Sequence, residues 1–123
     1  SKIDKFFINK NIIFTILLTN SLNIKKLNKK FRNRNKPTDV LSFPFFSSYN
    51  LKFIKQKNFY IGDIAAAYEI INSRARKNNF SFEFDKVWIH GLLHLIGYDH
   101  IKDRDYSAMN RIEKKILNSI TLQ

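Results

Sequence analysis

The chain has 123 residues, no cysteine and a formal net charge of +12 at pH 7, with a pI near 10.0. This length fits one hydrophobic core, so we expect residues 1–123 to form a single domain. The lack of cysteine excludes disulfides and thiolate ligands and is compatible with the reducing cytoplasm, where we expect the protein to work. A chain this basic is expected to meet a polyanion such as RNA, DNA or an anionic membrane, although an AT-rich genome also encodes many lysines.

The first third of the chain predicts a strand, a basic helix and a second strand. Residues 1–10 suit the end of an amphipathic helix, and residues 11–18 form an isoleucine-rich run that predicts a buried strand. This run is too short to span a bilayer, which takes about 20 apolar residues. Residues 38–43 indicate a second strand, and Pro44 requires this strand either to end there or to lie at a sheet edge. Between the strands, apolar residues at helical spacing among lysines predict a helix with the inward row Leu22, Ile24, Leu27 and Phe31.

The rest of the chain predicts a third strand and three helices. Residues 45–58 are rich in aromatic, polar and basic residues, which indicates a loop or hairpin. Residues 60–67 predict the third strand, and residues 68–77 a helix that ends in cations. Ser81 is the predicted N-cap of the next helix, which is apolar enough to be buried. A last helix is expected to start near Asp103, with the inward row Met109, Ile112, Ile116 and Ile120.

All three histidines of the chain lie in the segment HGLLHLIGYDH at 90–100. Residues four apart share one face of a helix, so His90 and His94 can aim two imidazoles at one point. Gly97 tolerates positive φ and is expected to end the helix, which lets His100 return as a third ligand. Three histidines leave the fourth position of a zinc ion open, as in catalytic sites. The plainer alternative, three unconnected histidines, is disfavoured by this spacing.

The same spacing also occurs in the extended zinc-peptidase motif H-E-x-x-H-x-x-G-x-x-H. Where that motif carries its general-base glutamate, this chain has Gly91. Glycine cannot accept a proton, so the peptidase interpretation lacks its catalytic carboxylate.

Several motifs together resemble those of the YbeY-like bacterial endoribonucleases, which are also described as rRNA maturation factors. HGLLHLIGYDH at 90–100 resembles the family signature, PTDVLSFP at 37–44 a second motif, GDI at 62–64 a third, and residues 109–117 the C-terminal helix. The resemblance implies an α+β fold, with a small mixed β-sheet of three to four strands, about four helices and the histidine helix central. The strand and helix that open the family pattern are absent or shortened here.

The resemblance implies one zinc ion (Zn2+) held by His90, His94 and His100, with Arg32 as a catalytic residue. It implies a zinc-dependent, single-strand-directed endoribonuclease that acts in 16S rRNA 3′-end maturation and quality control of the small ribosomal subunit. The expected partners are RNA, the small subunit, its ribosomal proteins and the assembly GTPase Era, with no membrane and no small-molecule cofactor. Arginine suits this chemistry because its guanidinium donates two hydrogen bonds to a phosphodiester. From composition alone, Arg32 would be one more solvated cation.

The proton acceptor stays open at this point. A zinc-bound hydroxide, Asp99 or the RNA 2′-hydroxyl could fill that role. Asp99 and Asp63 could instead be partners of the metal ligands that fix the orientation of the imidazoles. Phe31 and Ala67 stand where the family usually has tyrosine and serine, so any hydrogen bond from those hydroxyls is in doubt. Two other functions remain open. One is a non-catalytic ribosome-assembly or RNA-binding factor with a structural zinc, and the other is a metallopeptidase, which Gly91 disfavours.

Overall fold

The computed structural model of the protein describes residues 10–46, 55–76, 79–98 and 103–121. The helical segment predicted before Lys10 lies outside these ranges, as do Asp99 and His100. Within the described ranges, no helix is long and apolar enough to cross a membrane.

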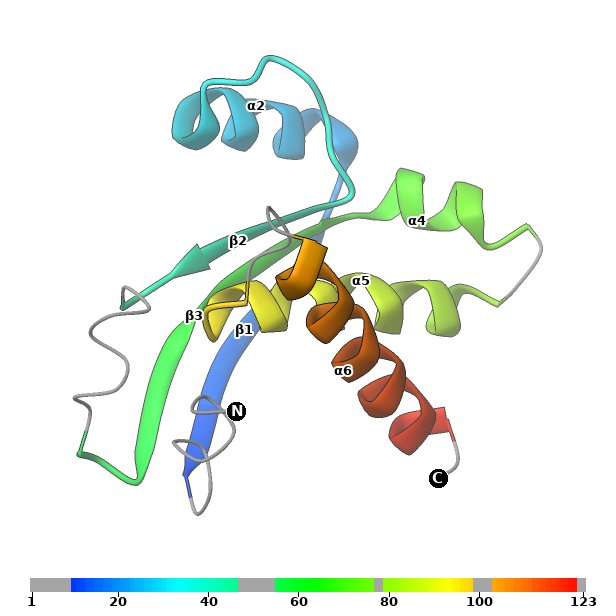
Figure 1. Ribbon diagram of the computed structural model, residues 1–123. Helices are drawn as coiled ribbons and strands as arrows, with labels where there is room; N and C mark the ends of the chain where they lie inside the picture. The colour runs from blue at the N-terminus through cyan, green and yellow to red at the C-terminus, as the bar shows by residue number, and fades with distance from the viewer. Residues whose placement is uncertain (1–9, 47–54, 77–78, 99–102, 122–123) are drawn as a thin grey trace.

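A three-stranded mixed sheet forms the centre of the molecule (Figure 1), with the strand order β1-β3-β2. Strand β1 (Asn11–Thr19) runs parallel to β3 (Asn58–Ala67), and β2 (Val40–Pro44) pairs with β3 in the antiparallel direction. The predicted α+β fold with a small mixed sheet is therefore confirmed. Strand β2 lies at an edge, which agrees with the position of Pro44, since proline cannot donate a ladder hydrogen bond.

A bulge in β3 decides which side chains face which helices. Ile13 pairs with Tyr60 but Phe14 pairs with Gly62, so one residue of β3 is extra. Gly62 has a φ of +146°, and a side chain there would collide with the main-chain oxygen of Phe43. The bulge lets Ile61 and Ile64 of β3 pack in one cluster with a leucine of the histidine helix, Leu95.

The two faces of the sheet are covered by different helices (Figure 1). Helix α2 (Ser21–Arg32) lies on one face, where Ile24 packs against Ala65 and Ala67 of β3. On the other face lies α5 (Phe80–Leu95), the histidine helix, with α6 (Asp103–Thr121) packed against it. The short helix α4 (Tyr68–Arg74) follows β3 directly and contacts both α2 and α5. The histidine helix thus lies between the sheet and α6, in the central place expected for it.

The inward row predicted for α2 is only partly right. Ile24 is completely buried, but Leu22 is 61% exposed and Phe31 50% exposed. The second buried residue of this helix is Asn28, whose side-chain amide donates to the main-chain oxygen of Lys36 at 2.8 Å. The helix is therefore turned so that a polar side chain faces inward, because that amide holds the loop that follows the helix.

The ends of α4 and α5 differ from the prediction. Helix α4 ends at Arg74, three residues before the predicted end at 77. The N-cap of α5 is Asn79, whose side-chain oxygen accepts from the N–H of Phe82 at 2.7 Å, and not Ser81. Asparagine and serine are equally good caps, and the earlier start is favoured because Phe80 then stacks on Phe84 within the same helix.

The C-terminus of α5 is as predicted. Gly97 has a φ of +105°, and the N–H groups of Tyr98 and Gly97 donate back to the carbonyls of Leu93 and His94. This pair of bonds is a Schellman motif, which glycine allows at little strain. The inward row of α6 is also confirmed, since buried Met109 and its partners Ile112, Ile116 and Ile120 pack against α5.

Candidate metal centre

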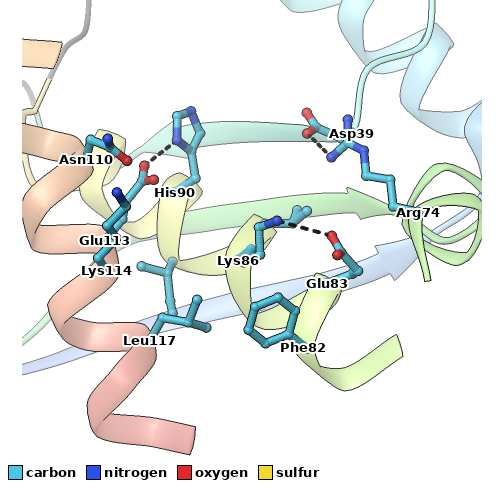
Figure 2. A pocket seen from close by; sticks show the side chains of 12 residues that line it. Asp39, Arg74, Phe82, Glu83, Lys86, His90, Asn110, Glu113, Lys114 and Leu117 are labelled. Carbon is cyan, nitrogen blue, oxygen red and sulfur yellow. Dashed lines mark hydrogen bonds and ion pairs between the residues drawn. The ribbon is translucent and has the colours of Figure 1, made fainter. Parts of the chain in front are cut away.

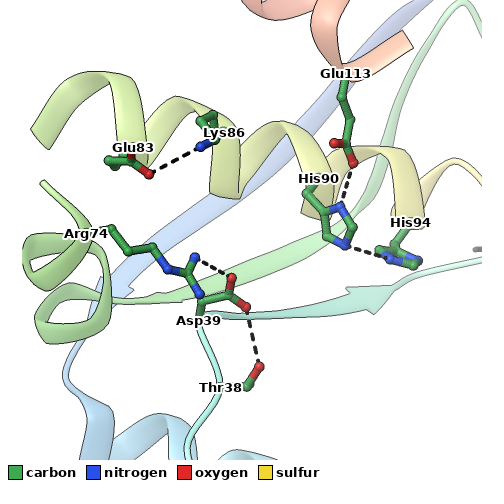
Figure 3. Close-up of polar contacts among 8 residues, drawn as sticks. All are labelled: Thr38, Asp39, Arg74, Glu83, Lys86, His90, His94 and Glu113. Carbon is green, nitrogen blue, oxygen red and sulfur yellow. Dashed lines mark hydrogen bonds and ion pairs between the residues drawn. The ribbon is translucent and has the colours of Figure 1, made fainter. Parts of the chain in front are cut away.

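His90 and His94 lie one turn apart on α5, and their imidazoles converge (Figure 3). The two Nε2 atoms are 3.1 Å apart and the ring centroids 4.7 Å apart, with both side chains half-buried. Nitrogens bound tetrahedrally to one zinc ion at about 2.0–2.1 Å lie roughly 3.3 Å from each other. The pair therefore fits two ligands of one such ion. His100 lies outside the described residues, within which no group of three metal-binding side chains is gathered.

Glu113 of α6 is a partner of His90 that the sequence did not reveal. Its Oε1 atom lies 2.5 Å from Nδ1 of His90, with the His90 side chain 35% exposed and that of Glu113 26% exposed. This hydrogen bond raises the pKa of His90, burial of the ring opposes the rise, and the charges of Glu113 and Asp39 add to it. The sequence contains one indication that Glu113 faces α5: it lies one turn after Met109, at the margin of the inward row of α6.

Gly91, the residue that follows His90, faces the sheet. Gly91 is buried, and a Cβ atom there would lie 2.9 Å from a methyl of Ile64 and 3.1 Å from the hydroxyl of Ser42. Glycine at 91 is thus required for close packing of α5 on the sheet. A glutamate side chain could not extend from this position toward the imidazoles, so the geometry agrees with the argument against a peptidase.

Arg32 approaches the histidine helix through Ser42 of the edge strand β2. Its Nη2 donates to the main-chain oxygen of Ser42 at 2.6 Å, and its guanidinium lies 5.5 Å from the ring centre of Phe43. The hydroxyl of Ser42 in turn donates to the carbonyl of Gly91 at 2.8 Å. Arg32 is exposed at the end of α2 and is linked through Ser42 to Gly91, the residue that follows His90.

A cleft of about 520 Å³ runs along α5 beside His90 (Figure 2). His90 and Glu113 lie at one end, and the ion pair between Asp39 and Arg74, at 2.7 Å, lies at the other. Three carboxylates and three cations are among its lining residues: Asp39, Glu83, Glu113, Arg74, Lys86 and Lys114. These formal charges balance, so the excess positive charge of the chain lies outside the cleft.

Asp63 does not orient the imidazoles. It alternates along β3 with Ala65 and Ala67, which face α2, so it lies on the opposite face of the sheet from α5. Its carboxylate accepts a hydrogen bond from the hydroxyl of Tyr60, which raises the pKa of that phenol. Sequence position alone does not show on which face a strand residue lies when a bulge precedes it.

The fold and the histidine pair define a small α+β protein whose central helix is suited to metal binding, and comparisons with known proteins identify its family. The family model described as "Endoribonuclease YbeY" matches residues 2–121. The Endoribonuclease YbeY of Pelagibacter ubique is 52% identical over 118 residues, which cover 93% of this chain and 73% of that protein. That of Buchnera aphidicola is 43% identical over 114 residues, which cover 90% of this chain and 70% of that protein.

A solved structure also matches. The solution structure of TM1509 from Thermotoga maritima is 31% identical with a TM-score of 0.60, and the match covers 94% of this chain and 74% of that one. The family model spans nearly the whole chain, and the relatives agree with it. The chain therefore belongs to the Endoribonuclease YbeY family.

Proposed function

We propose that this protein is a zinc-dependent endoribonuclease, a hydrolase of RNA phosphodiester bonds. The observation that carries the proposal is the convergence of His90 and His94, with Nε2 atoms 3.1 Å apart, in a chain whose relatives are named as endoribonucleases. The net charge of +12 supports a polyanionic substrate, because such a field attracts phosphate.

In this proposal one zinc ion is held by His90, His94 and His100. When bound, zinc lowers the pKa of a coordinated water and polarises a phosphoryl oxygen. Arg32 binds the phosphodiester at the rim of the site. A guanidinium has five N–H donors, and the hydrogen bond to Ser42 fixes its position while leaving donors for a phosphate oxygen. Gly91 holds α5 close to the sheet and takes no part in proton transfer.

The proposed substrate is single-stranded RNA, and the proposed role is 16S rRNA 3′-end maturation and quality control of the small ribosomal subunit in the cytoplasm. The small subunit, its ribosomal proteins and the GTPase Era are the candidate partners. A single strand suits a site of this kind because its backbone can enter a cleft beside the imidazoles without unwinding a duplex.

The test compares the wild type with His94→Ala and Arg32→Ala on single-stranded RNA, duplex RNA and a peptide. Each is assayed with and without a chelator, and bound metal is measured in parallel. Arg111→Ala is the matched control, since Arg111 is exposed on the outer side of α6. We expect His94→Ala to lose metal and cleavage together, and Arg32→Ala to keep metal but cleave about 10²–10³-fold more slowly.

The other functions make different predictions in the same experiment. RNA cleavage that survives both the chelator and His94→Ala would contradict a zinc nuclease. Ribosome maturation that is intact in a folded, metal-free His94→Ala protein would favour a binding factor. Peptide cleavage that depends on metal would support a peptidase.

A further inference from the structure

We propose that Glu113 is a positioning residue for the metal centre: its carboxylate fixes the tautomer and orientation of His90, so that Nε2 of this histidine is presented to the metal. The proposal rests on the proposed zinc site and deepens it. It assigns to α6 a part in metal binding, although none of the three proposed ligands lies on this helix.

The two nitrogens of His90 have different partners. Nδ1 lies 2.5 Å from the Oε1 atom of Glu113, whereas Nε2 lies 3.1 Å from Nε2 of His94 (Figure 3). An ionised carboxylate can only accept, so Nδ1 must carry the proton of this contact. In the neutral ring Nε2 then keeps its lone pair, on the side where His94 lies. This is the arrangement in which a histidine binds a metal through one nitrogen while a carboxylate holds the other.

Glu113 is held in place by the packing of α6 on α5. Met109, one turn earlier on α6, is 2% exposed and packs in one cluster with Ile89 and Leu93 of α5. These two α5 residues directly precede His90 and His94 in the chain. The same interface that buries Met109 therefore sets the position of Glu113 relative to both imidazoles, and a shift of α6 would move the carboxylate away from the ring.

Glu113 differs from the other acidic residues of the cleft in its partner. Glu83 pairs with Lys86 at 3.5 Å, and Asp39 pairs with Arg74 at 2.7 Å (Figure 2). Both are bound to cations further along the cleft, whereas the carboxylate of Glu113 contacts His90. Glu83→Gln removes one negative charge from the same cleft at a residue that pairs with Lys86, so it is a matched control.

The experiment uses the full chain and zinc itself as the probe. The dissociation constant for Zn²⁺ is measured by competition with a chromophoric chelator for the wild type, Glu113→Ala, Glu113→Gln and Glu83→Gln. Loss of such an outer partner costs about 10–100-fold in metal affinity, which is the weakening expected for Glu113→Ala. Glu113→Gln keeps an acceptor oxygen and the side-chain volume, so it should lose less, and Glu83→Gln should stay within about threefold of the wild type.

The second measurement needs no metal and no activity. Nitrogen NMR of the metal-free protein, at alkaline pH where the ring is neutral, identifies which nitrogen of His90 carries the proton. We expect the Nδ1–H form in the wild type and a shift toward the Nε2–H form in Glu113→Ala. A merely structural Glu113 would leave this tautomer unchanged, and circular dichroism shows whether each variant is folded.

A folded Glu113 variant with unchanged zinc affinity and an unchanged His90 tautomer would overturn the proposal. If this variant had also lost RNA cleavage, Glu113 would be a proton acceptor instead. If the wild type binds no zinc, the proposed function fails, and the tautomer measurement still decides whether Glu113 positions His90.

Discussion

The two faces of the sheet carry helices of opposite character. On one face α5 is closely packed, with Val87, Ile89, Leu93 and Leu95 all at most 4% exposed. On the other face α2 buries only Ile24 and Asn28, and leaves Leu22 and Phe31 at least half exposed. Two of the three proposed metal ligands, His90 and His94, lie on the closely packed helix, and lysines line the loosely packed one. We thus assign the precise placement of side chains to the α5 face and the attraction of a polyanion to the α2 face.

The two faces meet at the edge strand β2. Ser42 accepts a hydrogen bond from Arg32 of α2 through its main chain and donates one to α5 through its hydroxyl. Strand β2 therefore contacts both the helix of the proposed phosphate-binding arginine and the helix of the proposed metal ligands His90 and His94, and it sets the position of one relative to the other. The substitutions proposed below alter residues on one face of the sheet, on both faces, or at Ser42, which connects them.

The largest effect is expected at Gly91, where α5 touches the sheet. Gly91→Glu forces a carboxylate against Ile64 and Ser42, which combines overpacking with burial of a charge. We expect the free energy of unfolding to fall by about 4 kcal/mol or more, or the protein not to fold. Urea unfolding monitored by circular dichroism measures this.

The matched change on the other face is Lys26→Glu, since Lys26 is exposed on α2. Its effect on stability should stay within about 0.5 kcal/mol. If Gly91→Glu were as well tolerated as Lys26→Glu, position 91 would not face the sheet and a carboxylate there could reach the metal centre.

The second prediction compares one buried isoleucine on each face. Ile89 of α5 is 1% exposed and Ile24 of α2 is 0% exposed, so truncation of either to alanine should cost about 2–4 kcal/mol of stability. Ile89→Ala should also weaken zinc binding, because Ile89 packs in the interface that holds α6 beside the imidazoles. Ile24→Ala should not. Urea unfolding and zinc titration measure the two quantities, and equal zinc affinities for both variants would contradict the assignment of precise placement to the α5 face.

The third prediction concerns the link itself. Ser42→Ala removes the hydroxyl bond to Gly91 but keeps the main-chain oxygen that accepts from Arg32. We expect a loss of about 1 kcal/mol in stability, measured by urea unfolding, and unchanged zinc content. RNA cleavage should fall in this variant if the hydroxyl keeps β2, and with it Arg32, in register with α5. Cleavage at the wild-type rate would show that the main-chain contact alone is sufficient.

The sequence predicted those features that depend on local pattern. The three strands follow from runs of β-branched and apolar residues, and the paired histidines and the helix end at Gly97 follow from spacing and from the conformational freedom of glycine. The side on which a residue lies was harder to predict. Asp63 was left open as a residue that could orient the imidazoles, and the bulge in β3 that puts it on the α2 face is not visible in the sequence. Asn28 was missed because its partner is a main-chain oxygen in a loop.

The sequence shows Glu113 only as a residue at the margin of the inward row of α6, and it does not show the contact of Glu113 with His90. Its partner His90 is 23 residues away on another helix, and only the packing of Met109 on α5 sets the register between the two helices. Contacts of this kind depend on tertiary packing, which residue spacing within one helix does not report.

The smallest effect is expected where α2 begins. Both carboxylate oxygens of Glu69 on α4 accept from the N–H of Ser21, at 3.1 and 3.0 Å, and this bond lowers the pKa of Glu69 below its ordinary value of 4.5. A group with a lowered pKa in the folded state stabilises the fold above its unfolded pKa, and this contribution is lost as the pH falls through the folded pKa. Glu69→Gln should therefore be less stable than the wild type at neutral pH, and the difference should close as the pH falls below about 4.5. Urea unfolding across this range measures the difference.

Ser21→Ala is the control, because it keeps the main-chain N–H and should retain most of the pH dependence. A difference between Glu69→Gln and the wild type that persisted in acid would mean that the ionised carboxylate does not stabilise the start of α2.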